Sequence, residues 1–425
     1  MKHLKTYKIF EAAKKNELGL TAAQEKFLDD HTGNIQGDFI SGKLKKSDSR
    51  VWSYNPKTGL VDVQGDFMCE RSNNPSIRGI KFGKVTGNFL LRGNIDSTEG
   101  FPKIVGETFN FYTGKALKGN SLEGMPEKVG KSFWIGLGPS EIKNLEGGPK
   151  EVGGDYVIRG DFANLENLKG SPEKIIKDFR IDRPLTVKSL EGGPKEVGGN
   201  FSIPLAEYED LKGSPRKVGG DFSVGSPNLI SLEGSPDEVG TYAISEPSEK
   251  LSSLKGITQK VNSISISWTG ISNLIGCPEA IPGSFRLSSN DNLVSLEGGP
   301  KKVGGNYGVY WCPLNSIEGI PDVIGGEVTV RINREDPDLI DLGRGEWNKE
   351  NILDAFLYGK HPKRYDLIFP VIPKKWIQDL VDENPEKMTV VLSPLSKHPL
   401  IKEIVWPKNL KNEVDLLSTL GSVGL

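Results

Sequence analysis

The stretch of this sequence that comes closest to a catalytic motif is GMPEKVGKS, residues 124–132. A phosphate-binding P-loop has four residues between its first glycine and the Gly-Lys-Ser/Thr triplet, so that backbone N–H groups can surround a phosphate. Here five residues separate Gly124 from Gly130. The same skeleton recurs along the chain, mostly without the lysine and serine, which indicates a structural role.

Other residue types that carry chemistry are few and scattered. The histidines and cysteines are His3, His31, His361, His398, Cys69, Cys277 and Cys312. No histidine has a Cys, Asp or Glu at metal-ligand spacing, and no G-x-S-x-G nucleophile motif occurs. The repeated GGPKEVGG stretches precede predicted strands, whereas phosphate binding also needs a helix N-terminus. We therefore expect no enzyme active site, no metal and no cofactor.

The feature that organises the chain is a repeat, seen clearly in SLEGGPKEVGGNF at residues 189–201. Twelve units begin at residues 77, 98, 122, 145, 168, 190, 211, 232, 254, 274, 296 and 317. The mean period is about 22 residues, and self-similarity in this range is typical of a solenoid. Each coil is too small to fold alone, so its hydrophobic face must be buried against the neighbouring coils.

Within a coil, the alternation of residue types predicts one short strand. Phe201 and Ile203 point inward and Ser202 points outward. Leu190 and Val197 complete the apolar face of this coil. Stacking these strands side by side predicts a parallel sheet with one continuous core.

The segment before this strand contains a proline and two glycines. Pro194 cannot donate a ladder hydrogen bond, so we expect an extended segment outside the sheet. Gly198 and Gly199 fit a tight bend that leads into the strand.

These units resemble leucine-rich repeats of the short-period kind without a convex helix. They also resemble repeat proteins encoded by large tailed bacteriophages, whose units read LEG-x-P-x-x-VGG-x-F. The stretches MKHLKTYKIFE, LTAAQEKFLDDHTG and WSYNPKTGLVDVQGDF are similar to the N-terminal part of those proteins. The resemblance covers about residues 1–332. It implies a repeat solenoid with a leucine-rich-repeat-like stack of short parallel strands, capped by a helical N-terminus and an α/β C-terminus.

The sequence departs from the leucine-rich-repeat pattern at one position. Such repeats usually carry an Asn five residues after the first strand residue, and these side chains form a ladder. Asn94 and Asn290 occupy that position here. Elsewhere it holds Pro184, Ala206, Pro227 and Cys312. We therefore expect uneven turns in place of a regular Asn ladder.

The charge balance and the absence of long apolar runs limit the kinds of partner that we expect. Lys and Arg number 54 against 56 Asp and Glu, a net charge of −2, which makes a nucleic-acid partner unlikely by comparison with basic nucleic-acid-binding proteins. No run approaches 18 apolar residues and no signal-peptide core begins the chain, so no membrane partner is expected. Three scattered cysteines predict no disulfide framework.

Three regions follow from the repeat boundaries. Residues 1–66 are predicted to be a helical cap and lead-in, with a capping box at Thr21 and Gln24 and a polar, irregular stretch from residue 33. Val61, Val63 and Phe67 are expected to form the first strand. Residues 67–332 form the solenoid. Residues 333–425 are a mainly helical cap or small appended domain, with a short strand expected at residues 388–392.

Five of the units carry a glutamate at the same repeat position. This position holds Glu123, Glu146, Glu191, Glu233 and Glu297. A row of acids one strand apart predicts a solvated edge, with charge offset by Lys150, Lys195, Lys217 and Lys301.

The candidate binding surface is the outward face of the stacked strands. We list as protein-binding candidates Arg92, Tyr112, Trp134, Arg159, Arg180, Arg286, Tyr310 and Arg331. Arg, Tyr and Trp contribute most to interface energies. Leu90 and Asn110 are expected to point outward beside them. The middle coils present small residues such as Ser202 and Ser223.

These observations predict a non-enzymatic scaffold that binds protein partners. The phage resemblance implies a virion structural component with capsid or tail subunits as partners, in the virion or the host cytoplasm. One alternative is a phage-encoded protein that sequesters a bacterial host or defence factor. Another is an enzyme or nucleic-acid binder acting through residues 333–425.

Overall fold

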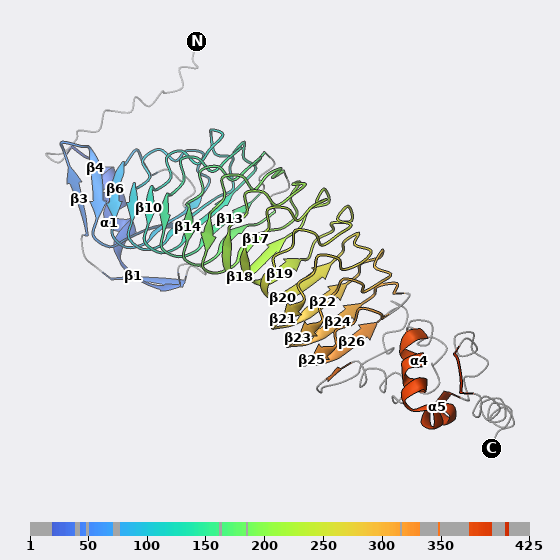
Figure 1. The fold of residues 1–425 in the computed structure, drawn as a ribbon. Helices are drawn as coiled ribbons and strands as arrows, with labels where there is room; N and C mark the ends of the chain where they lie inside the picture. Colours follow the sequence, from blue (N-terminus) through green and yellow to red (C-terminus); the bar gives the residue numbers. More distant parts are fainter. Residues whose placement is uncertain are drawn as a thin grey trace, which may run out of the picture. The chain divides into compact units, whose positions relative to one another are not determined.

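The computed structural model describes residues 19–38, 43–47, 51–70, 77–160, 164–183, 186–314, 317–331, 347–348, 374–392 and 404–407 (Figure 1). The chain divides into two compact units. The first comprises residues 1–229 and 233–240, and the second comprises residues 230–232 and 241–425. Each unit is described by itself.

The first unit begins with α1 (Ala22–His31) and β1 (Thr32–Asp38), β2 (Lys43–Ser47) and β3 (Trp52–Asn55), and continues as two parallel ladders. One ladder runs through β4 (Leu60–Val63), β6 (Phe82–Val85), β8 (Ile104–Val105), β10 (Lys128–Val129), β12 (Glu151–Val152), β14 (Lys174–Ile175), β16 (Glu196–Val197) and β18 (Lys217–Val224). The other runs through β5 (Asp66–Glu70), β7 (Phe89–Gly93), β9 (Phe109–Thr113), β11 (Phe133–Leu137), β13 (Tyr156–Gly160), β15 (Phe179–Ile181), β17 (Phe201–Ile203) and again β18.

The second unit repeats this plan. Its parallel ladders are β20 (Lys260–Ser267), β22 (Phe285–Ser288), β24 (Tyr307–Tyr310) and β26 (Val328–Arg331), and β21 (Ala280–Ile281), β23 (Lys302–Val303) and β25 (Val323–Ile324). The strand β27 (Trp347–Asn348) pairs antiparallel with β25. The helices α4 (Lys374–Glu383) and α5 (Pro385–Leu392) follow, and β19 (Glu238–Ile244) contains the division between the units.

The predicted fold class is confirmed. The chain is a parallel β-solenoid of about twelve coils with little helix, and the described part of residues 77–331 contains no helix. The predicted anchors of one coil are all buried, since Leu190, Val197, Phe201 and Ile203 are at most 1% exposed.

The expectation that the segment after Pro194 lies outside the sheet is wrong. Glu196 and Val197 form β16, which pairs with both neighbouring coils. Pro194 lies two residues earlier, so its missing N–H costs this ladder nothing. Each regular coil therefore contributes two strands, one on each side of the glycine bend.

The glycine of the Leu-x-Gly signature is explained by a turn. In the coil that begins at Leu190, the Gly193 N–H donates to the Leu190 carbonyl at 3.1 Å, and Gly192 has φ of +79°. A type II turn needs positive φ at its third residue, which favours glycine. The corresponding glycine of all twelve predicted units has positive φ, which confirms the twelve starts.

The glycine pair after the valine is explained by close stacking. The predicted bend is present at Gly198 and Gly199, yet neither has positive φ. A Cβ added to Gly198 would lie within 3.0 Å of the Ile176 carbonyl oxygen in the preceding coil. Only glycine lets the two backbones approach this closely.

Stacked aromatic rings form the core of the first unit. Phe179, Phe201 and Phe222 lie in successive coils with ring centroids 5.4 Å apart and interplanar angles of 8° and 14°. This spacing follows from that of parallel strands, about 4.8 Å. The column continues toward the N-terminus through Tyr156 and Phe133.

Tyr156 is a tyrosine in a column of phenylalanines, and its hydroxyl is buried without a hydrogen-bond partner. Burial raises the pKa of this phenol. Because an unsatisfied buried donor is unfavourable, Tyr156→Phe is expected to raise the free energy of unfolding by about 1 kcal/mol. Urea unfolding followed by circular dichroism measures the change.

The matched control is Tyr208, which is equally buried but bonded. Its hydroxyl donates to the Ile203 carbonyl at 2.9 Å and accepts from the Gly225 N–H at 2.7 Å. Tyr208→Phe should therefore lower the free energy of unfolding by about 1–3 kcal/mol. If the two substitutions changed the free energy of unfolding equally, hydrogen bonding of the tyrosine hydroxyl would not account for the changes.

A polar ladder occurs one residue before the aromatic anchor. The Asp178 carboxylate accepts from the Asn200 N–H at 2.8 Å, and the Asn200 side chain accepts from the Asp221 N–H at 2.7 Å. At the leucine-rich-repeat position, Asn290 is buried, donates to the Ile266 carbonyl and accepts from Thr269. Asn94 is exposed. The two asparagines at this position thus differ in burial, and the polar ladder before the anchor was not expected.

The recurring acids lie on a solvated edge, as predicted, since all five are exposed. Two of these acids form ion pairs with lysines other than those expected to offset the charge of the row. Glu191 pairs with Lys169 at 3.7 Å and Glu233 pairs with Lys212 at 3.3 Å. Both lysines occupy the same repeat position in the preceding coil. The predicted partners pair with other acids: Lys195 with Glu173, Lys217 with Glu238 and Lys301 with Glu279.

The N-terminal region was only partly predicted. The capping box at Thr21 and Gln24 is present, and α1 packs Phe27 and Leu28 inward. The irregular stretch expected from residue 33 is instead largely β1 to β4, with β1–β2 and β3–β4 antiparallel. Val61 and Val63 belong to β4 and Phe67 to β5, because the chain bends between them.

The C-terminal region is helical where it is described. Trp376, Ile377 and Val381 form the buried face of α4. The strand expected at residues 388–392 is wrong, because these residues end α5. Buried Met388 and Thr389, with the Thr389 hydroxyl donating to the Pro385 carbonyl at 2.7 Å, show that helix packing overrides the β-propensity of this segment.

Candidate functional site

A hollow of about 540 Å³ opens on the outward face of β7, β9, β11 and β13 in the first unit. It brings together four of the eight predicted binding residues: Arg92, Tyr112, Trp134 and Arg159. Its remaining lining is Gly93, Asn94, Asn110, Gly114, Ile135, Gly136 and Val157. Each candidate comes from a different coil, and strand register alone places them at one recess.

Trp134 and Arg159 form one wall of the hollow. The guanidinium carbon of Arg159 lies 5.2 Å from the centroid of the Trp134 ring, which allows a cation–π interaction. The Arg159 Nε also lies 3.3 Å from the Asp182 carboxylate. A ring on one side and an acid on the other hold the guanidinium in place while its side chain stays 54% exposed.

Tyr112 covers the floor of the hollow, and Gly136 makes room for it. The two residues are register partners in β9 and β11. A Cβ at Gly136 would lie within 3.0 Å of the Tyr112 ring, so the ring rests against the Gly136 backbone. Tyr112 remains 56% exposed.

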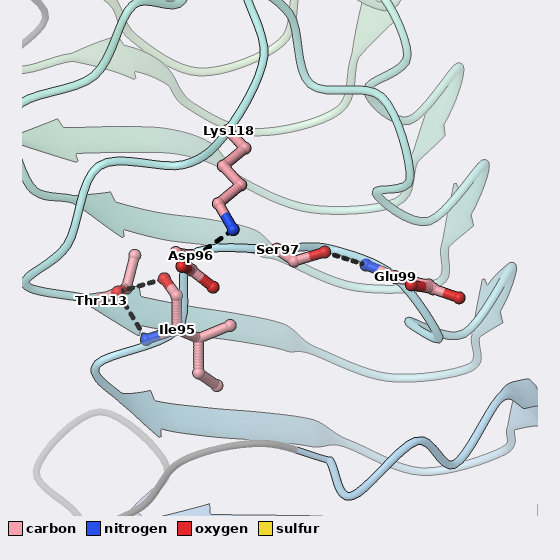
Figure 2. A network of polar contacts seen from close by, with 6 residues as sticks. All are labelled: Ile95, Asp96, Ser97, Glu99, Thr113 and Lys118. Carbon is pink, nitrogen blue, oxygen red and sulfur yellow. Dashed lines mark hydrogen bonds and ion pairs between the residues drawn. The ribbon is translucent and has the colours of Figure 1, made fainter.

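The backbone beside Tyr112 is fixed by the next residue. The Thr113 hydroxyl accepts from the Ile95 N–H at 3.0 Å and donates to the Ile95 carbonyl at 2.7 Å (Figure 2). Figure 2 also shows Lys118, from the next coil, paired with Asp96; their charged atoms lie 3.3 Å apart. Since Thr113 is buried, this bond ties two coils together directly behind the hollow.

Arg92 closes the opposite side of the hollow. Its terminal nitrogen lies 3.4 Å from a Glu70 carboxylate oxygen in the preceding coil. Both arginines of the hollow are thus held by an acid that does not itself line it.

The other predicted binding residues lie elsewhere. Arg180 is exposed, shares Asp182 with Arg159 and does not line the hollow. In the second unit, the Arg286 guanidinium lies 4.9 Å from the Tyr310 ring centroid. This pair resembles that of Trp134 and Arg159. Arg331 occupies a strand position in β26, and its side chain lies outside the described residues.

Two outward positions are not exposed as expected. Leu90 is fully buried and Asn110 is 9% exposed. Asn110 lies in register between Leu90 and Trp134, and large neighbours on both sides cover a shorter side chain. Sequence reasoning also missed Val157 and Gly136, because neither residue type suggests binding. The strand register could have identified Gly136, because it places this glycine between Tyr112 and Arg159.

The stretch that resembles a P-loop is structural. Gly130 abuts the Gly106 carbonyl of the preceding coil, Lys131 pairs with Glu107, and the Ser132 hydroxyl donates to Asp155 at 3.0 Å. The segment leads into a strand, β11. It therefore lacks the helix N-terminus that phosphate binding requires.

The described cysteines and histidine form no reactive site. Burial raises the pKa of Cys277 to about 12, so its thiol is protonated at neutral pH and is a poor nucleophile. Cys69 and Cys312 are buried. The His31 ring stacks on Phe27 and its Nδ1 lies 2.8 Å from the Phe27 carbonyl oxygen. No group of three metal-ligating side chains occurs among the described residues.

No known protein family, curated protein or solved structure matches this chain. Of the helices that the structure describes, none combines the length and apolar character needed to cross a bilayer.

Proposed function

We propose that this chain is a non-enzymatic repeat scaffold that binds a protein through the hollow. The observation that carries the proposal is the convergence of two arginines and two aromatic side chains, from four successive coils, on one recess. These residue types dominate interface energies. The strands, the contact between Trp134 and Arg159 and the flanking acids hold these side chains in place. Side chains that are already ordered lose little entropy on binding, which favours affinity.

The sequence resemblance supports a narrower form of this proposal. As a leucine-rich-repeat-like protein of a large tailed phage, the chain would be a virion component whose partners are capsid or tail subunits. In that case, mass spectrometry of purified particles finds the chain in many copies per particle. If particles lack it and infected-cell extracts yield a bacterial protein bound to the hollow, the alternative of host-factor sequestration takes its place.

Replacing Trp134 and Arg159 together by alanine tests the binding surface. The double variant is expected to weaken partner binding at least about 100-fold, because the two residues support each other at the wall of the hollow. The measurement is capture on the immobilised chain, followed by titration of the captured partner.

The matched control is Arg286→Ala with Tyr310→Ala, which removes the similar pair in the second unit. This variant should retain capture. Neither pair belongs to the core, so both variants should unfold at the wild-type temperature within a few degrees. If the Trp134/Arg159 variant captures the partner as well as the wild type does, the hollow is not the binding surface.

A further inference from the structure

The charge of the hollow favours an acidic occupant. Its described lining contains two arginines, two asparagines and no acid. On one side, Arg159 and Arg180 share the single carboxylate of Asp182, so this cluster carries a net positive charge. The Arg159 Nε lies 3.3 Å from the Asp182 carboxylate, and the Arg159 side chain is 54% exposed. Because a guanidinium has five N–H donors, Arg159 can also bind a carboxylate of a partner.

The positions of the two arginines set the length of the occupant. Arg92, Tyr112, Gly136 and Arg159 are register partners across β7, β9, β11 and β13. Three strand spacings separate the two arginines, about 14 Å between their backbones. An extended peptide rises about 3.3 Å per residue, so residues four apart are about 13 Å apart and point to the same side.

The centre of the hollow favours an apolar side chain. Midway between the arginines, Tyr112 lies against Gly136, and the neighbouring row contributes Trp134 and Val157. The residue two positions after the first acid of an extended peptide points to the same face. It would therefore enter this apolar centre.

We propose that the hollow binds an extended segment of a protein partner with the pattern acid-x-apolar-x-acid, which crosses the four strands. The two acids pair with Arg92 and Arg159, and the apolar side chain packs against the Tyr112 ring between them. This inference rests on the proposed protein-binding function and specifies the partner's chemistry. A single-stranded nucleic acid is disfavoured, because acids pair with both arginines and the row of outward residues beyond Arg180 continues with Ser202 and Ser223, which are not basic.

Fluorescence anisotropy with the full chain and labelled 11-residue peptides tests the pattern. The probe carries Glu-Ser-Leu-Ser-Glu between Gly-Ser flanks. A neutral version has Gln for both Glu, and a spacing version has the two Glu adjacent. The first peptide is expected to bind at least 10-fold more tightly than either version, and raising the salt concentration should weaken it. Equal affinities, or no binding of the first peptide at 1 mM, would overturn the proposal.

Variants locate the site. Arg159→Gln and Arg92→Gln should each reduce affinity for the acidic peptide at least 10-fold and leave affinity for the neutral peptide unchanged. Arg286→Gln in the second unit is the control and should have no effect. A 12-nucleotide oligo-dT and a neutral hexasaccharide are tested in the same way. If either binds more tightly than the acidic peptide and its binding requires Trp134, the proposal is overturned and that ligand class is assigned to the hollow.

Partner capture and peptide binding together distinguish a failure of this inference from a failure of the proposed function. If partner capture depends on Trp134 but the acidic and neutral peptides bind alike, the hollow binds protein by other contacts and only the acidic pattern is wrong. If the acidic peptide binds but the Trp134/Arg159 double variant captures the partner normally, the proposed function fails.

Discussion

Gly153→Ala is expected to lower the free energy of unfolding of the first unit by about 3 kcal/mol. A Cβ at this position would lie well inside 3.0 Å of the Gly130 carbonyl oxygen in the preceding coil. The obstructing atom belongs to the backbone of the stack, so it cannot rotate away as a side chain would. The two coils must separate locally, which strains the ladder hydrogen bonds and the core behind them.

Gly114→Ala is the matched control for this substitution. Its nearest neighbour would be the Asn94 side-chain oxygen at 3.5 Å, an ordinary van der Waals distance, and its φ is not positive. It should change the free energy of unfolding by less than about 0.5 kcal/mol. Urea unfolding followed by circular dichroism compares the two variants. Similar midpoints would contradict the view that close stacking, not flexibility, selects glycine after the valine.

The predictable parts of the fold are those whose residue types are determined by the conformation of a single repeat. The Leu-x-Gly signature and its looser copies identified twelve units, because the third residue of the turn needs positive φ, as at Gly192. Phe201 and Ile203 were placed in the core because alternation identifies the inward face of a strand. Because the same turn and strand pattern recurs in twelve units, the sequence indicates a solenoid clearly.

The parts that were missed depend on contacts between repeats. The β16 ladder arises because Glu196 and Val197 lie beside equivalent residues of two other coils. No single repeat shows this pairing. The polar ladder through Asn200 likewise becomes visible only when its side chain meets the N–H of Asp221 in the next coil.

The candidate site was predicted in part. The outward positions of Arg92, Tyr112, Trp134 and Arg159 followed from the strand period, so four of the residues that line the hollow were identified. The shape of the recess was not, because it depends on Gly136, whose lack of a side chain lets the Tyr112 ring lie against the backbone of the next strand. Arg180 was predicted together with them, and it pairs with Asp182 and does not line the hollow.

Phe201→Ala is expected to lower the free energy of unfolding by about 3–5 kcal/mol. Phe201 is fully buried, and its ring lies 5.4 Å from those of Phe179 and Phe222. Its removal leaves a cavity between two rings that the backbone ladders hold at strand spacing, so neither ring can move to fill it. The loss therefore combines the lost burial of the ring with the cost of the cavity.

The loss should also be local, because each coil of a solenoid contacts only its neighbours. Hydrogen exchange in Phe201→Ala should accelerate most at the Phe179 and Phe222 amides. The Phe109 amide, four coils earlier in the column, should change much less. Ser202→Ala is the control: this neighbouring side chain points outward and is partly exposed, so exchange should stay as in the wild type. Uniform acceleration across the first unit would instead mean that its coils unfold as one cooperative block.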